Sequence, residues 1–242
     1  MIGLGTAVNI VTVLVGGGLG AVAGHRMPER VRTLTTDVLG LVTGVNAVMA
    51  AAAVVSLSLT KAVGSTWPLF IVLFSLLLGG FVGSALKIEI RLELFAAWLK
   101  AKFARDDAQF INGFVTASLI FCIGPLAIMG SFDDGMGLSI DKLLLKSTLD
   151  GFAAFAFAAS LGWGVAASAI AVGLYQGLLT VVGMGLGQLW NESQIAGMTA
   201  VGGLMLMAIS FKLLNIKTIA TGDLLPALFI APYVVALVAQ LQ

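Results

Sequence analysis

The chain has 242 residues, of which 59% are hydrophobic and 10% charged, and its formal net charge is +1. A soluble domain carries about 25% charged residues, so this composition, with a mean hydropathy of +1.06, excludes a protein whose whole surface faces water. The near-neutral charge also excludes a basic surface for nucleic acid. Apolar stretches longer than the roughly 18 residues of a membrane-crossing helix predict an all-α integral membrane protein.

Eight apolar segments are predicted to cross the membrane. In chain order they are 2–24, 33–59, 67–86, 110–130, 143–164, 165–187, 195–214 and 224–241. The fifth and sixth form one run, which we divide at Gly162-Trp163-Gly164 because the run is about twice as long as one crossing needs. Since no basic residue precedes the first segment and arginines follow it, we expect a retained helix there rather than a cleaved signal peptide.

The segment 88–107 lies between the third and fourth spans and mixes apolar with charged residues. It is too charged to cross the bilayer. We expect an amphipathic helix on the cytoplasmic membrane surface, with Trp98 at the depth of the lipid headgroups. The strict alternation of residues 88–94 leaves a strand as the alternative.

Positive charges divide unequally between the two sides that this order of spans defines. Ten follow odd-numbered spans: Arg26, Arg30, Arg32, Lys87, Arg91, Lys100, Lys102, Arg105, Lys212 and Lys217. Three follow even-numbered spans: Lys61, Lys142 and Lys146. The positive-inside rule places the first group in the cytoplasm and both termini outside it.

Two nearly identical hexapeptides, VGGGLG at 15–20 and VGMGLG at 182–187, suggest an internal repeat. Aligning them pairs Asn9 with Gln176, and further along pairs Gly40 with Gly203. Spans one to three thereby match spans six to eight. Because paired spans differ by five in order, the copies cross in opposite directions, which predicts the inverted repeat of many secondary transporters. The alternative is convergence of glycine-rich helices that pack closely.

This repeat predicts one transmembrane domain over 1–242 with four parts. They are repeat A at 1–87, the surface segment at 88–107, a central antiparallel helix pair at 110–164 and repeat B at 165–242. Gly124 and Pro125 in the fourth span, with Gly162 and Gly164 at the end of the fifth, predict that this pair is broken. Breaks occur where backbone faces protein or a wet cavity, although a packing kink is the alternative.

Lys146 and Asp150 are the charged pair deepest in the predicted spans. Their i, i+4 spacing places them on one helix face, with Ser147 nearby. A charge at the centre of a membrane helix costs about 2.5–3.5 kcal/mol on insertion scales, so an intramembrane ionisable residue indicates a functional site. The alternative is an ion pair that only anchors the helix. Asp37 in the second span is the secondary candidate, and a helix-dipole partner is its alternative role.

Polar side chains on other spans complete the predicted substrate or ion site. They are Asn9, Asn46, Asn112, Thr116, Ser118 and Gln176. We predict no metal site, no cofactor and no enzymatic activity. The aspartates of 131–142 do not match a calcium loop, Cys122 has no metal-ligand partner, and G-x-G-x-x-A at 18–23 follows a helix where a nucleotide site needs a strand.

Five stretches resemble the bacterial and archaeal domain-of-unknown-function family numbered 554. They are FVTASLIFCIGPLAIMGSFDDG, LLLKSTLDGF, YQG, MTAVGG and LLPALFIAP. The resemblance covers nearly the whole chain. It implies a multi-pass protein of the prokaryotic plasma (inner) membrane and implies no activity. The positions it carries over are Ser118, Gly124, Pro125, Gly130, Asp134, Gly135, Lys146, Asp150 and Gln176.

Two functions are compatible with these features. The first is a small secondary transporter or channel for a small polar or ionic solute, in which Asp150 or Asp37 couples transport to a proton or sodium ion. The second is a non-transporting assembly or sensor protein that acts through helix oligomerisation. The expected partners are membrane lipid, with a small solute or ion in the first case and a second copy of the chain in the second.

Overall fold

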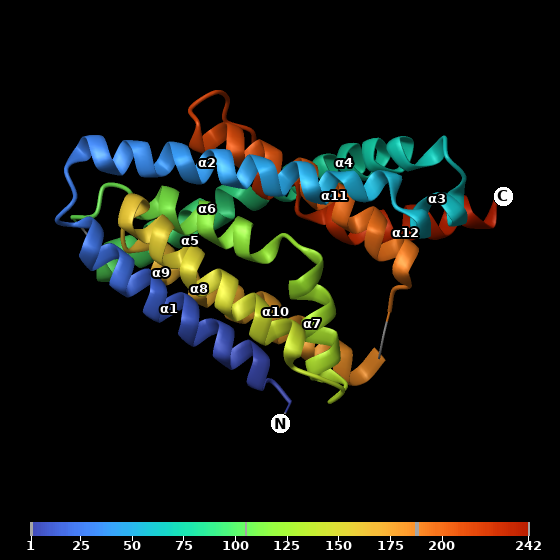
Figure 1. Cartoon of the computed structure of the whole chain (residues 1–242), viewed down its shortest axis with the longest axis horizontal. Coiled ribbons are helices and arrows are strands. Elements are labelled where there is room, and N and C mark those ends of the chain that lie inside the picture. Colours follow the sequence, from blue (N-terminus) through green and yellow to red (C-terminus); the bar gives the residue numbers. More distant parts are fainter. Residues whose placement is uncertain (1, 105, 187–188, 242) are drawn as a thin grey trace. The chain divides into compact units, whose positions relative to one another are not determined.

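The computed structural model describes residues 2–104, 106–186 and 189–241, without the side chain of Leu186. Arg105, which counts among the loop charges, and Gly187, which ends the second hexapeptide, lie outside the described residues. Across the described ranges the regular structure consists of helices joined by turns (Figure 1).

The helices follow the predicted spans closely. They are α1 Leu4–Gly24, α2 Glu29–Ala51, η1 Ala52–Val55, α3 Leu57–Val63, α4 Trp67–Leu86, α5 Ile88–Phe103, α6 Phe110–Cys122, α7 Pro125–Gly135, α8 Asp141–Leu161, α9 Gly164–Ala167, α10 Ala169–Leu186, α11 Glu192–Leu213, η2 Thr221–Leu224 and α12 Pro226–Gln240. In the described part of the chain, seven stretches are long and apolar enough to cross a membrane, and α6 with α7 makes an eighth if it counts as one span. The prediction of an all-α protein with about eight membrane helices is confirmed.

The segment after the third span is the helix α5, so the alternative of a strand was wrong. Lys87 adopts the left-handed conformation with φ 54° and ends α4, and α5 starts at the next residue. On α5, Phe95 stacks on Trp98 with ring centroids 5.9 Å apart, and the Lys102 ammonium lies 4.9 Å from the Trp98 ring. Its place on the membrane surface stays a prediction.

The chain forms two compact units, each made from two stretches of sequence. The first contains Met1–Leu39 and Leu92–Leu189, and therefore α1, α6, α7, α8, α9 and α10. The second contains Gly40–Arg91 and Trp190–Gln242, and therefore α3, α4, α11 and α12. The division into repeats A and B, with a central pair between them, stays a prediction.

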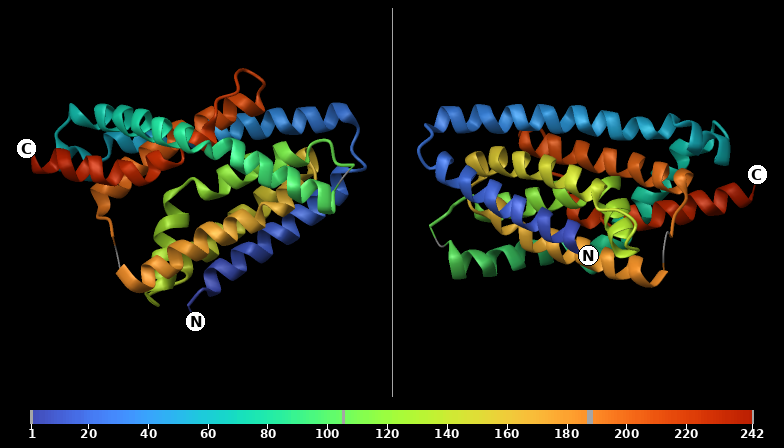
Figure 2. Two further views of the ribbon diagram at one scale, coloured as in Figure 1. Left: turned by 180° about the vertical axis from the view of Figure 1, so that it is seen from behind. Right: turned by 60° about the horizontal axis from the view of Figure 1, so that its bottom comes forward.

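In the first unit, α1 lies along α8 and runs in the same direction (Figure 2). Glycines four residues apart on α1 meet the backbone of α8 at residues that are also four apart. The contacts join Gly16 to Gly151, Gly20 to Phe155 and Gly24 to Ala159. A methyl group at any of these α1 glycines would overlap a carbonyl oxygen of α8. The first hexapeptide therefore allows two membrane helices to approach closely.

Each pair of spans that the alignment relates lies in contact and antiparallel. In the first unit, Asn9 of α1 bonds to Gln176 of α10. In the second unit, Gly79 and Gly83 of α4 lie against α12 and the turn before it, and Gly203 of α11 lies against Ala51 of α2. This arrangement is compatible with an inverted repeat, and the repeat stays a prediction.

The fourth span is broken in its middle. α6 ends at Cys122, α7 begins at Pro125, and their axes bend by 65°. Gly124 between them has φ 153°, a conformation that side chains with a Cβ rarely adopt. Proline suits the first position of a helix, where its missing N–H would have no partner in any case.

The fifth span is not broken, which corrects the prediction that both members of the central pair are interrupted. α8 is one helix from Asp141 to Leu161. Gly162, with φ 77°, ends it, and Gly164 opens α9 against the carbonyl oxygen of Phe110. These two glycines make the turn between spans because small residues let α9 approach the start of α6.

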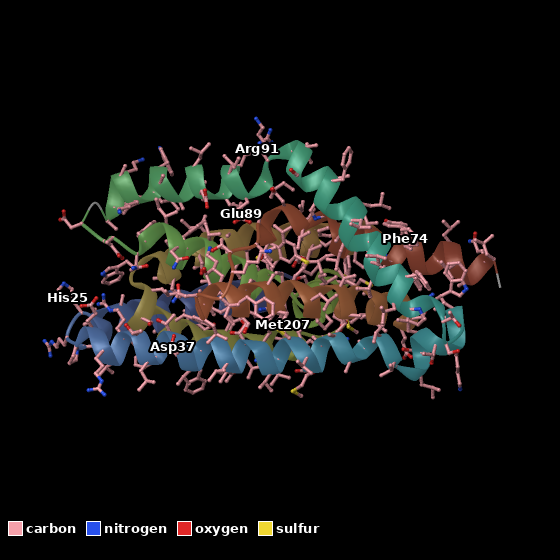
Figure 3. All side chains as sticks on the ribbon, turned by 90° about the horizontal axis from the view of Figure 1, so that it is seen from above. His25, Asp37, Phe74, Glu89, Arg91 and Met207 are labelled. Atoms are coloured by element: carbon pink, nitrogen blue, oxygen red, sulfur yellow. The ribbon has the colours of Figure 1, made fainter. Side chains whose placement is uncertain are left out.

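In the second unit, α3, α4, α11 and α12 enclose an apolar core. Its buried residues are Leu59, Val63, Ile71, Ala196, Val235 and Val238. At the start of α5, the Glu89 carboxylate accepts a hydrogen bond of 2.7 Å from the N–H of Gly222 (Figure 3). The Asp223 carboxylate accepts one of 2.9 Å from the N–H of Glu89. These reciprocal bonds join η2 to the end of the third span.

Candidate functional site

Four polar side chains from three helices meet inside the first unit. We call Asn9 of α1, Lys146 and Asp150 of α8, and Gln176 of α10 the polar cluster. Lys146 and Asp150 form an ion pair through Asp150 Oδ2, which also accepts a bond of 3.0 Å from Asn9 Nδ2. Asn9 Nδ2 also donates to Gln176 Oε1 at 3.2 Å. One continuous network therefore joins three spans.

The cluster is buried. The exposed fraction is 0% for Asn9 and Gln176, 6% for Lys146 and 8% for Asp150. Removing two charges from water is costly, and their mutual attraction compensates only when geometry and additional hydrogen bonds are good. The hydrogen bond from the Asn9 side chain to Asp150 is one such addition, so a neighbouring helix helps to stabilise the ion pair.

Local sequence explains why these residues meet. One helical turn of α8 places Lys146 and Asp150 on the same face. Small residues then allow the neighbouring helices to come close: Gly151 of α8 lies against Thr12 of α1, and Gly173 of α10 lies against Ile10. The Asn9 amide can therefore reach both α8 and α10.

The two amides have unused hydrogen-bonding capacity. Asn9 Oδ1 and Gln176 Nε2 are buried and have no hydrogen-bond partner among the described residues. Buried polar side-chain atoms are paired in the large majority of cases. An unpaired acceptor and an unpaired donor beside a buried ion pair mark a place where a further polar group can bind.

The broken span ends beside the cluster. Cys122, the last residue of α6, lies within electrostatic reach of both Lys146 and Asp150. α7 begins three residues later and contacts both α8 and α10. The interruption of the backbone and the buried charges therefore share one region of the first unit.

Four predicted site residues, Ser147 on α8 and Asn112, Thr116 and Ser118 on α6, do not join the network. Ser147 is buried, but its hydroxyl donates to the carbonyl oxygen of Leu143 at 2.6 Å. Thr116 donates to Asn112 at 3.3 Å, one turn away on α6. Ser118 is buried, and its hydroxyl has no hydrogen-bond partner within the described ranges.

Two further candidates do not belong to the network. Asn46 is exposed on the part of α2 that belongs to the second unit. Asp37 is half-buried on α2, and His25 is exposed beyond the end of α1 (Figure 3). We leave Asn46 and Asp37 out of the site.

Sequence reasoning missed two polar contacts made by α1 and the residue before it. Thr6 of α1 and Thr180 of α10 are hydrogen-bonded at 3.2 Å. Thr6 lies three residues before Asn9, and Thr180 lies four residues after Gln176. Residues at these spacings share a helix face, so the aligned pair Asn9 and Gln176 could have predicted this contact. The Asp134 carboxylate accepts bonds of 3.0 and 3.1 Å from the N–H groups of Gly3 and Gly5, which stabilises the start of α1.

A second ion pair connects the start of α8 to the end of α7. Lys142 Nζ lies 2.6 Å from Asp133 Oδ2. Its lysine side chain is 38% exposed, against 8% for that of Lys146. This pair offers a control for the chemistry of the cluster, because it joins the same residue types one turn away along α8.

These helices and this buried network define a multi-pass all-α membrane protein. The chain belongs to the family described as Protein of unknown function (DUF554), whose model matches residues 4–236. The resemblance seen in the sequence is thereby confirmed. The matched range includes every residue of the polar cluster.

Two relatives are similar over nearly their whole length. The chain is 28% identical over 234 residues to the uncharacterized membrane protein YdfK of Bacillus subtilis (strain 168), covering 96% of this chain and 95% of YdfK. It is 30% identical over 236 residues to the uncharacterized protein YqgA of Escherichia coli (strain K12), covering 94% of each. No solved structure matches the chain. The name of YdfK and the apolar helices agree in placing the protein in a membrane.

Proposed function

We propose that this protein is a small secondary transporter or channel that moves a small polar or ionic solute across the prokaryotic plasma membrane. One observation carries the proposal: the buried ion pair Lys146–Asp150 is connected through Asn9 to Gln176. Ionisable residues inside membrane helices are expensive and mark ion or substrate pathways. Here three spans contribute polar groups to a single point.

The broken span supports the same function. Transporters commonly bind solutes where discontinuous helices expose backbone groups inside the membrane, and non-helical backbone is tolerated there because protein or a wet cavity satisfies it. The bend between α6 and α7 follows Cys122, which is close to the charges of the cluster. We place the solute between this break and Lys146.

The orientation of the protein is part of the proposal. α1 and α8, the first and fifth spans, run in the same direction, and α10, the sixth span, runs in the opposite direction. This is the order that alternating membrane crossings require. The excess of lysine and arginine in loops after odd-numbered spans then favours a cytoplasmic position for those loops and an extracytoplasmic one for both termini. We propose no enzymatic activity, since the cluster contains no nucleophile paired with a base. Association with lipid or with a second copy stays a prediction.

Ligand-dependent stabilisation tests the proposal. Purified protein is screened by thermal unfolding against ions and metabolites, since a solute at 100 times its Kd adds about 2.7 kcal/mol to the free energy of unfolding. Hits are then followed as uptake into proteoliposomes. We expect Asp150→Asn to change uptake, and Asp133→Asn, in the control ion pair, to leave uptake close to wild type.

Two outcomes contradict the proposal. A hit that crosses equally well in Asp150→Asn removes the cluster from the pathway. Absence of any binding or uptake in well-folded protein favours a non-transporting assembly or sensor protein that acts through helix oligomerisation.

A further inference from the structure

We propose that the polar cluster binds one proton on Asp150 together with one small monovalent anion on Lys146, which makes this protein a proton–anion symporter. The inference rests on the proposed transport function and names its solute class and coupling ion. Charge balance, the two unpaired amide atoms and the position of the helix break support it independently.

Charge balance in the buried site makes the two ligands depend on each other. Without ligand, the ammonium of Lys146 and the carboxylate of Asp150 cancel. An anion alone leaves a net charge of −1 inside the membrane, and a proton alone leaves +1, and both states are disfavoured in apolar surroundings. A proton and a monovalent anion together restore a net charge of zero. The empty and the fully loaded site are therefore the two neutral states.

The proton transfer itself is simple. A proton from water forms an O–H bond with the Asp150 carboxylate, and the Lys146 ammonium keeps all of its own protons. The ammonium then loses its charged partner and donates hydrogen bonds to the anion in its place. Release of both ligands reverses these steps and re-forms the ion pair.

The amide pair fits both protonation states of Asp150. Asn9 now donates to the carboxylate, whereas a protonated carboxyl group donates and needs an acceptor. A half-turn of the Asn9 amide presents Oδ1 to Asp150, and a half-turn of the Gln176 amide lets Nε2 donate to the same Oδ1. The two atoms that this second arrangement uses are the two that are buried and unpaired in the part of the chain that the structure describes.

The region beside Lys146 suits a small anion. α7 begins three residues after Cys122, which lies within electrostatic reach of Lys146. The N–H groups in the first turn of a helix have no intrahelical acceptor and carry the positive end of the helix dipole. Ser118, one helical turn before Cys122 on α6, carries a buried hydroxyl without a hydrogen-bond partner among the described residues. Because no member of the cluster is more than 8% exposed, the burial of the site favours an anion of few atoms.

Asp150 is the acid best placed to take the proton. The titratable side chains on its own helix and on the elements that surround it are Asp141, Lys142 and Lys146 on α8, Cys122 on α6, Tyr175 on α10, and Asp133 and Asp134 on α7. Asp133 and Asp134 lie at the far end of α7, where one pairs with Lys142 and the other binds the start of α1. Within the described span of α1 there is no titratable side chain.

Calorimetric titration of the full chain in detergent measures the coupling directly. The probes are choline chloride, choline nitrate and choline formate, each in two buffers with different heats of ionisation. We expect at least one anion to bind with uptake of about one proton. Its affinity then falls about tenfold for each pH unit over the range in which Asp150 is ionised, because one proton is linked to each anion.

Three substitutions assign the roles of the two charges. Asp150→Asn imitates the protonated acid, so anion binding is kept, proton uptake is lost and the affinity no longer depends on pH. Lys146→Gln lowers anion affinity at least tenfold. Lys142→Gln, in the control pair one turn away, leaves affinity and proton uptake unchanged. Size-exclusion profiles establish that each variant is folded, and the pH dependence of the wild type needs no variant.

Other outcomes overturn the inference. They are anion binding without proton uptake, proton uptake that persists in Asp150→Asn, and binding at the cluster of sodium or of the zwitterion glycine in place of the anions. Sodium or glycine that binds and crosses proteoliposomes would leave the proposed transport function standing. Failure of every probe and every screened solute to bind or cross would remove both proposals.

Discussion

Two ion pairs lie one helical turn apart along α8, and their aspartate side chains are similarly buried, but the exposure of their lysines and their neighbours differ. Lys142–Asp133 joins the start of α8 to the end of α7, and its lysine is partly exposed. Lys146–Asp150 is buried and connected to two amides on α1 and α10. The comparison shows that depth and neighbours, rather than the pairing itself, make an ion pair a candidate site.

The largest expected effect comes from breaking the buried pair. Asp150→Ala leaves the Lys146 ammonium buried without a counter-charge, and such changes cost about 3–5 kcal/mol of stability. Denaturant or thermal unfolding in detergent measures the loss. A cost equal to that of Asp133→Ala would contradict the contrast between the pairs.

Replacing both charges sharpens the same contrast. Removing a whole buried ion pair in favour of apolar residues is often neutral or stabilising. We expect the double variant Lys146→Met with Asp150→Leu to recover most of the stability that Asp150→Ala loses, while it lacks solute binding. If the double variant is as unstable as the single one, the pair is needed for the fold itself.

The glycine contacts that bring α1 to α8 are expected to have an intermediate effect. Gly20→Ala places a methyl group against the carbonyl oxygen of Phe155, and overpacking of this kind costs about 1–3 kcal/mol. Gly18→Ala is the control, because its nearest neighbour, Trp163, would be 3.9 Å away. Equal melting temperatures for the two variants would show that close approach of α1 is not required.

The smallest expected effect is at the control pair. Lys142→Gln removes a partly exposed partner, and such pairs contribute about 0–1 kcal/mol. The effect decreases further as salt is added, since salt screens exposed charges. A salt-insensitive loss above that range would mean that Lys142–Asp133 behaves as a buried pair.

The sequence predicted the helices because long apolar runs leave few alternatives, and α4 has the predicted bounds. Lys146 and Asp150 were found from helical spacing alone. Asn9 and Gln176 are 167 positions apart, and only the alignment of the two hexapeptides connected them. That alignment located a real contact, while the repeat that motivated it stays a prediction.

The remaining differences have local physical causes. Ser147 shares the face of Asp150, but a helical serine readily bonds to the preceding turn of its own helix. Asn46 is exposed because a single polar residue does not fix which face of a helix turns inward. The break predicted for the fifth span lies at the end of that span. From sequence alone, Gly162 could kink a helix or end it, and its positive φ shows that it ends α8.

The i, i+4 placement of Lys146 and Asp150 has a consequence for biosynthesis. Both charges enter the bilayer on one helix, where they can neutralise each other before α10 is present. When α8 enters the bilayer, Asn9 was synthesised more than 130 residues earlier, and Gln176 has not yet left the ribosome. The nascent chain therefore carries its own counter-ion through the translocon, and the amides complete the arrangement only after α10 has been inserted.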